Sequence, residues 1–187
     1  MSFLTANWNN LALINYAIDP EILKPYIPKG TELDFYNNTC YVSLVGFLFN
    51  NTKLLGLPIP FHRNFEEVNL RFYVKCKEGN EWKRGVVSIK ELVPKSALTL
   101  IANTVYKEHY QTVPMKHVIK ETDSSFSFNY SWEMNNKWQH INIKTSNELS
   151  PILANTEEEF ICEHYFGYTK HKDQTFEYEV KHPRWNN

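Results

Sequence analysis

The segment 67–76 alternates between polar and apolar side chains without a break. Successive side chains of a β-strand point to opposite faces, so this pattern predicts a strand. One face would carry Val68, Leu70, Phe72, Val74 and Cys76. The other face would carry Glu67, Asn69, Arg71, Tyr73 and Lys75. The turn residues 77–80 then lead into a predicted partner strand, 82–89, which indicates an antiparallel sheet.

Other short runs rich in β-formers follow the same rhythm. We expect a strand at 11–17, a hairpin of 31–36 with 41–49 around Asn37-Asn38, a meander of 115–121, 126–134 and 138–144, and a last strand at 176–180. Segment 51–65, with two prolines, reads as a loop. The sequence therefore predicts a mainly β chain with one domain, 1–187, whose antiparallel sheet curls or closes into a barrel.

Three helices are expected between these strands. Asp19-Pro20-Glu21 begins a short one, because Asp19 can cap free amides and Pro20 suits the first turn. Pro94 opens the longest, to about residue 106, with an apolar stripe at helical spacing. Thr156 with Glu159 resembles a capping box and begins the third, which extends through 161 and as far as 165.

Charge and composition narrow the possible partners. The chain has 187 residues, 42% of them hydrophobic, and 20 basic side chains against 21 acidic ones. A net charge of −1 gives no electrostatic reason to bind nucleic acid or an anionic membrane. No apolar run is long enough to span a bilayer, and the N-terminus lacks a signal peptide. Three widely spaced cysteines in apolar contexts predict reduced thiols, and hence a cytoplasmic protein.

The common catalytic signatures are absent. The sequence contains no GxGxxG, GxxxxGK[ST], GxSxG or HExxH motif, which argues against nucleotide chemistry. The seven histidines lack ligand spacing on a shared element, so we expect no metal and no cofactor.

The polar face of the alternating strand is the first candidate site. Such a face is solvated on a two-sided sheet. If the sheet closes, the same face would line the interior, where Arg71 could bind a ligand carboxylate with two parallel hydrogen bonds. Glu67, Asn69 and Tyr73 would lie beside it. Alternation alone does not choose between these two interpretations.

Two further segments gather titratable side chains. Lys107, Glu108, His109 and Tyr110 follow the predicted helix of 94–106, where they form either a polar loop or the border of a pocket. His164 lies at the end of the last helix, either on the surface or in a pocket wall.

Several strings together resemble one family. They are FLTANW at 3–8, NY at 15–16 with DP at 19–20, EVNLRFYV at 67–74, RGVV at 84–87, ELVP at 91–94, EHYFGYT at 163–169 and HPRW at 182–185. In this order they resemble the uncharacterised YqjF-like family of the acetoacetate-decarboxylase-like fold. The resemblance implies a cone-like antiparallel β-barrel with an internal pocket. Members usually continue past the last string, so the chain is either a natural short form or lacks a C-terminal segment. If such a segment closes the barrel, its absence would leave an open strand edge that favours a homo-oligomer.

Acetoacetate decarboxylase uses a lysine that forms a Schiff base with a β-keto acid, activated by a neighbouring lysine. Matching the helix ends puts these two positions on Tyr110 and Gln111, and matching Pro94 puts them on Lys107 and Glu108. Neither alignment gives adjacent lysines. The pocket arginine falls on Asn9, and the pocket glutamate on Glu66 or Glu67. The resemblance therefore predicts a pocket without imine chemistry.

Three functions stay open at this point. The first is the binding of a small anionic or aromatic molecule in an internal pocket, with Asn69, Arg71, Tyr73, Lys107 and His164 as candidate ligand-binding residues. The second is an enzyme acting on a small oxo acid. Glu67 or Glu108 would be its general base, Arg71 would bind the carboxylate, and Tyr110 or His109 would polarise or protonate. The third is a structural or partner-binding role.

Overall fold

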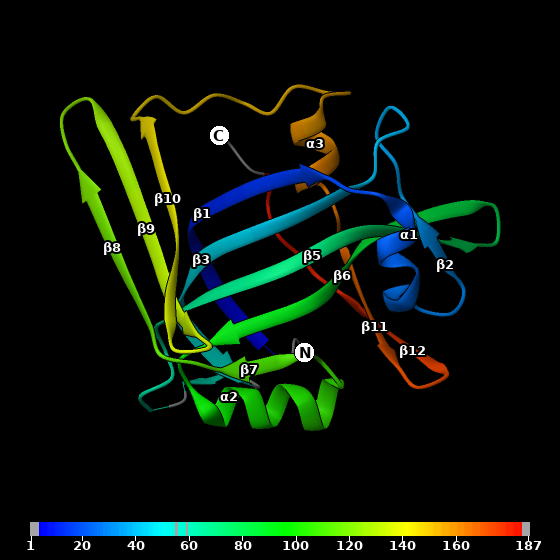
Figure 1. Cartoon of the computed structure of the whole chain (residues 1–187), viewed down its shortest axis with the longest axis horizontal. Helices are drawn as coiled ribbons and strands as arrows, with labels where there is room; N and C mark the ends of the chain where they lie inside the picture. Colours follow the sequence, from blue (N-terminus) through cyan, green and yellow to red (C-terminus); the bar gives the residue numbers. More distant parts are fainter. Residues whose placement is uncertain (1–3, 55, 59, 185–187) are drawn as a thin grey trace.

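The computed structural model describes residues 4–54, 56–58 and 60–184. Phe3 and Trp185, the two ends of the family resemblance, lie outside the described residues. The main sheet has nine strands, in the order β1-β3-β5-β6-β11-β12 with β2, β4 and β7 added beside this path (Figure 1). Their bounds are β1 Leu4–Ala17, β2 Thr31–Leu33, β3 Tyr41–Leu54, β4 Leu57–Pro58, β5 Phe65–Glu78, β6 Glu81–Val93, β7 Tyr110–Thr112, β11 Phe166–His171 and β12 Gln174–Glu179.

The predicted meander forms a second sheet of three strands. It consists of β8 Met115–Glu121, β9 Ser125–Met134 and β10 Lys137–Ser146, in the order β10-β9-β8. Its strands cross those of the main sheet (Figure 1). The chain is therefore mainly β, as predicted. Both sheets are open over the described residues, so the predicted closure into a barrel is not seen.

Three short helices join the strands. They are α1 Pro20–Leu23, which continues as a 3-10 turn over Lys24–Tyr26, α2 Ser96–Ile101, which continues as a π-helical turn over Ala102–Tyr106, and α3 Glu157–Cys162. The caps follow the sequence: Asp19 Oδ1 accepts the amide of Glu21, and Thr156 Oγ1 accepts the amide of Glu159.

The predicted hairpin of 31–36 with 41–49 is wrong in its pairing. The turn at Asn37-Asn38 exists, with both residues at positive φ and a single bridge between Tyr36 and Thr39. However, β2 pairs with β5, not with β3. Contacts with residues far along the chain hold this segment beside β5. The amide of Asp34 donates to the carbonyl of Tyr73 at 3.0 Å, and Arg84 Nε donates to the carboxylate of Asp34 at 2.6 Å.

Two other predictions need correction. The expected loop of 51–65 includes the end of β3 and the short strand β4, which pairs back on it. Strand β11 was not predicted. It pairs in parallel with β6 through Phe166 and Gly85, and antiparallel with β12.

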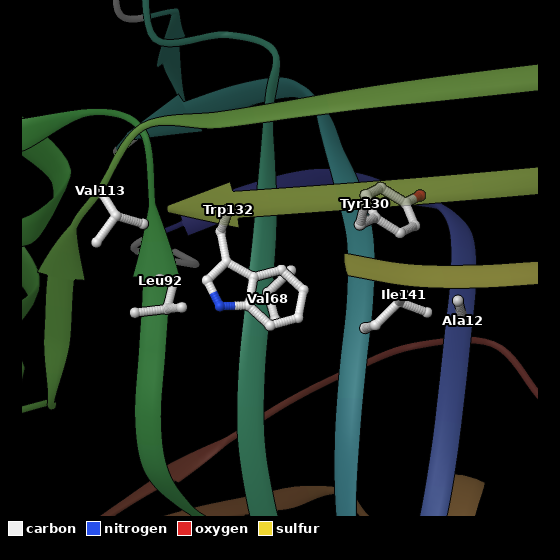
Figure 2. Packing of buried hydrophobic residues seen from close by; sticks show 7 residues of the cluster. All are labelled: Ala12, Val68, Leu92, Val113, Tyr130, Trp132 and Ile141. Carbon is white, nitrogen blue, oxygen red and sulfur yellow. The ribbon is translucent and has the colours of Figure 1, made fainter. Parts of the chain in front are cut away.

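Both faces of the main sheet are covered. On the face of Val68, the three-stranded sheet contributes Tyr130, Trp132 and Ile141, which pack against Ala12, Val68 and Leu92 (Figure 2). Gly46 permits this approach, because a Cβ there would lie 2.7 Å from the ring of Tyr130. Further along the same face, Leu23 of α1 packs against Phe72 and Val74. The polar residues of β5 point to the opposite face.

Candidate functional site

The polar row of β5 lies in the protein interior, between two hydrophobic clusters. Glu67 is 2% exposed, Asn69 7% and Tyr73 1%, whereas Arg71 is half-buried. One cluster surrounds Val45, Phe47 and Val93, and the other joins Tyr73 to Phe160 and Ile161 of α3. The row is therefore not a solvated sheet face, and only its Arg71 part meets solvent.

Two neighbours hold the carboxyl group of Glu67. The Tyr110 hydroxyl donates to Oε2 at 3.1 Å, and Asn69 Nδ2 donates to Oε1 at 3.3 Å. Burial raises the pKa of Glu67 to about 7, and the two hydrogen bonds oppose this rise. Glu67 can therefore gain or lose a proton near neutral pH.

A second carboxyl group faces the same interior from β6. Glu91 is 4% exposed and lies directly across from Asn69, with Tyr110 of β7 on its other side. Burial, together with the charges of Glu108 and Glu67, raises the pKa of Glu91 well above its ordinary value. Glu91 was not among the predicted site residues, because it lies beyond the predicted strand of 82–89.

A β-bulge puts Glu91 on this face. The partners Arg71↔Ser88 and Leu70↔Lys90 leave Ile89 as an extra residue in β6. Without the bulge, strict alternation from Ser88 would turn Lys90 and Leu92 to this side.

Glu108 is the third carboxyl group. Thr169 Oγ1 donates to its Oε1 at 2.8 Å, and the hydroxyl of Tyr178 also bonds to it. Burial raises the pKa of Glu108 and, more strongly, that of Tyr178. Tyr178 reaches this position across Gly167, where a Cβ would collide with the tyrosine ring. Thr169 was missed because β11 was not predicted, and Tyr178 because nothing in its predicted strand, 176–180, links it to Glu108.

Arg71 lies beside these groups on the same face. Its guanidinium carbon is 5.9 Å from the ring centroid of Tyr73. The hydroxyl of Tyr73 lies 2.5 Å from Ser43 Oγ, which donates to Asn15 Oδ1 at 2.6 Å. Tyr73 thus presents its ring, rather than its hydroxyl, to Arg71. Arg71 Nε is buried and has no hydrogen-bond partner among the described residues.

His164 forms part of the wall next to Tyr73. It is 6% exposed, its ring centroid lies 4.8 Å from that of Tyr73, and burial lowers its pKa to about 4. Its Nε2 lies 3.8 Å from Asp34 Oδ2, which is too long for a hydrogen bond. His164 is therefore neutral at physiological pH.

The remaining predicted residues lie apart from the three carboxyl groups. Lys107 Nζ donates to the Thr104 carbonyl at 2.7 Å, at the end of the π-helical turn. His109 is exposed, and its carbonyl oxygen accepts the amide of Glu91. Glu66 points to the other face of the sheet, where it meets His117 at 3.4 Å. Of the two glutamates suggested by the family resemblance, Glu67 is the one that lies beside Tyr110.

Two surface hollows lie elsewhere. One, of about 400 Å³, borders α2 and Thr112, and the other, of about 360 Å³, borders Asn7, Lys53 and Arg63.

Within residues 4–54, 56–58 and 60–184, no three His, Cys, Asp or Glu side chains are arranged to hold a metal ion. None of the described helices is long and apolar enough to cross a membrane.

Known proteins share this architecture. The chain is 26% identical over 181 residues to the uncharacterised protein YqjF of Bacillus subtilis strain 168, an alignment that covers 95% of this chain and 72% of YqjF. The acetoacetate decarboxylase of Legionella pneumophila superposes with a TM-score of 0.55 at 13% identity, over 90% of this chain and 61% of the decarboxylase. The enduracididine biosynthesis enzyme MppR, in complex with pyruvate, gives 0.59 at 10% identity, over 85% of this chain and 61% of MppR.

These structural likenesses establish the acetoacetate-decarboxylase-like fold, and the chain spans about three fifths of the length of those two structures. The family is identified by the sequence match, independently of the structural likeness. Residues 5–187 match the profile of DUF2071, and the chain belongs to this family of uncharacterised conserved proteins.

Proposed function

We propose that this protein binds a small organic anion on the interior face of the main sheet, with Arg71 as the group that holds the anion's carboxylate. One observation carries the proposal: the buried Nε of Arg71 lacks a hydrogen-bond partner within the described chain and shares its sheet face with the carboxyl groups of Glu67 and Glu91. A guanidinium binds a carboxylate with two parallel hydrogen bonds, one of which can come from Nε.

The surroundings of Arg71 favour such a contact. The side chain is half-buried, which leaves it open to a ligand from solvent but limits screening by water. The ring of Tyr73, fixed through Ser43, supports the guanidinium on one side. Asn69, with its amide held by Glu67, would border the same ligand.

The structural neighbours support this chemical class. MppR was solved with pyruvate, a small oxo acid, and the decarboxylase is named for another. This chain would act without the decarboxylase's reactive lysine, because one of the two positions matched to it is Tyr110, whose hydroxyl donates to Glu67. Lys107 donates instead to a helix carbonyl. We therefore propose ligand binding without a Schiff base.

A thermal-shift screen of small carboxylic acids tests the proposal, because a ligand that binds only the folded state raises the melting temperature. Acids that stabilise the wild type should lose their effect in Arg71→Gln. Arg63→Gln is the matched control, since Arg63 is exposed and borders one of the other hollows. If Arg63→Gln removes the effect and Arg71→Gln does not, the proposed site is wrong.

An enzymatic function is the second candidate, and the pKa of Glu67 favours it. A carboxyl group with a pKa of about 7 is matched to proton transfer at neutral pH. Glu67 would remove a proton next to the carbonyl of an oxo acid held by Arg71, and Tyr110 would orient its carboxyl group. Deuterium exchange at that carbon, followed by NMR, should occur with the wild type and stop with Glu67→Gln. Exchange that persists in Glu67→Gln would exclude this role.

A further inference from the structure

Two buried oxygen atoms on neighbouring strands have no hydrogen-bond donor in the described part of the chain. They are Oδ1 of Asn69 and Oε2 of Glu91. Asn69 and Glu91 are direct cross-strand partners, so their Cβ atoms are about 4.5–5.5 Å apart on the same face. Both residues are more than nine-tenths buried. Buried polar atoms are normally paired, so this pair of acceptors points to a donor between them.

The nearest unpaired buried atom along β5 is a donor rather than an acceptor. Arg71 Nε is a buried donor that lacks an acceptor within the same described residues. Asn69 and Arg71 are two positions apart on one face, a separation of about 7 Å along the strand. The interior face thus offers acceptors at one end and a donor at the other.

We propose that the ligand is a zwitterion, an amino acid or a related amino-bearing carboxylic acid, with its ammonium group between Asn69 and Glu91 and its carboxylate on Arg71. This inference rests on the proposed function and adds the cationic end of the ligand. A plain oxo acid would satisfy Arg71 but would leave the two acceptors without a donor.

The charges around the acceptor pair agree with this assignment. Glu67 of β5, Glu91 of β6 and Glu108 after the π-helical turn interact with one another, and Tyr110 of β7 and Tyr178 of β12 lie close enough to feel all three charges. Burial raises the pKa of all three carboxyl groups, and the charges of neighbouring carboxyl groups add to the rise for Glu67 and Glu91. An ammonium group would compensate the negative charge of the ionised form. Its binding should therefore release a proton.

Isothermal titration calorimetry at pH 7 with matched ligands tests the inference. Each amino acid of the series β-alanine, 4-aminobutyrate and 5-aminopentanoate is compared with the plain acid and the hydroxy acid of the same length. We expect the best amino acid to bind at least about tenfold more tightly than its two counterparts. The measured binding enthalpy should also depend on the ionisation enthalpy of the buffer, in the direction expected when the buffer takes up a proton released on binding.

Variants assign this preference to the two acceptors. Glu91→Gln, which keeps the shape of the side chain, should remove the preference for the amino group and the proton release, while binding of the plain acid persists. Asn69→Ala should weaken the preference in the same way. Glu32→Gln is the control, because Glu32 is exposed on β2. Arg71→Gln should weaken the binding of the amino acid and of the plain acid by similar factors.

The outcomes separate this inference from the function on which it rests. Equal affinities for the three ligand classes, or a preference that survives in Glu91→Gln, would overturn the zwitterion while leaving an acid-binding site at Arg71. If no acid binds the wild type, or if Arg71→Gln changes nothing, the proposed function fails, and the zwitterion fails with it.

Discussion

The hydroxyl of Tyr110 lies 3.1 Å from Oε2 of Glu67, although the two residues are 43 positions apart. This hydrogen bond ties the short strand β7 to the polar row of β5 at the carboxyl group of that row. A donor to a carboxylate stabilises its ionised form, so Tyr110 limits how far burial can raise the pKa of Glu67.

Tyr110→Phe should therefore move the titration of Glu67 to higher pH. It should also cost about 1 kcal/mol of stability, the usual net contribution of one hydrogen bond. Infrared titration of the protonated carboxyl band measures the first effect, with Glu67→Gln to assign the band. Tyr41→Phe removes a comparable bond to Glu157 and serves as the control. An unchanged Glu67 titration in Tyr110→Phe would contradict this role.

Glu67 should make the protein less stable as the pH rises. Its pKa is about 7 in the folded chain, against about 4.5 for an ordinary Glu, so between these values the folded state holds a proton that the unfolded state has lost. Stability then falls through this window and levels off above it, by about 3 kcal/mol from this group.

Chemical denaturation from pH 4.5 to 8 measures this fall. Glu91 and Glu108 contribute with the same sign, so the wild type is compared with Glu67→Gln, in which the fall should be smaller by the contribution of Glu67. Glu32→Gln should follow the wild type. Identical slopes for Glu67→Gln and the wild type would show that Glu67 is ionised throughout.

Gly167→Ala should destabilise the fold, because the added Cβ would collide with the ring of Tyr178. We expect a loss of about 1–3 kcal/mol, typical of overpacking. Repeating the substitution in a Tyr178→Ala background is the control, and there most of the cost should disappear. A cost that is the same in both backgrounds would mean that the ring is not the obstacle.

Borohydride reduction in the presence of pyruvate or acetoacetate should add no mass to any lysine. The two positions matched to the reactive lysine are Lys107, whose Nζ donates to the Thr104 carbonyl, and Tyr110, which carries no amine. Mass spectrometry of tryptic peptides reads the result, and an acetoacetate decarboxylase treated in parallel is the positive control. A reduced adduct on Lys107 would restore imine chemistry to this chain.

Local patterns were sufficient for much of the fold. The strict alternation of 67–76 predicted β5, and turn residues placed its partner β6 and the strands of the second sheet. Capping residues placed α1 and α3 to within a few positions. These features depend on neighbours in sequence, which is why they can be predicted from one chain.

The pairing of β2 and the second half of the site depend on distant residues. Nothing near Asp34 indicates that it binds Arg84, 50 positions away. The alternation of β5 identified Glu67 and Arg71 but left open whether their face was wet or enclosed. That question was decided by α3 and by Tyr110, which cover the row from other parts of the chain.

The extra residue Ile89 has an evolutionary consequence. Deleting it would restore even spacing in β6 and would still leave Lys90 across from Leu70 and Glu91 across from Asn69. The loss of this single codon would thus remove the irregularity of the strand and keep the acid in the interior. Relatives that are one residue shorter at this point should therefore still present an acid to the ligand.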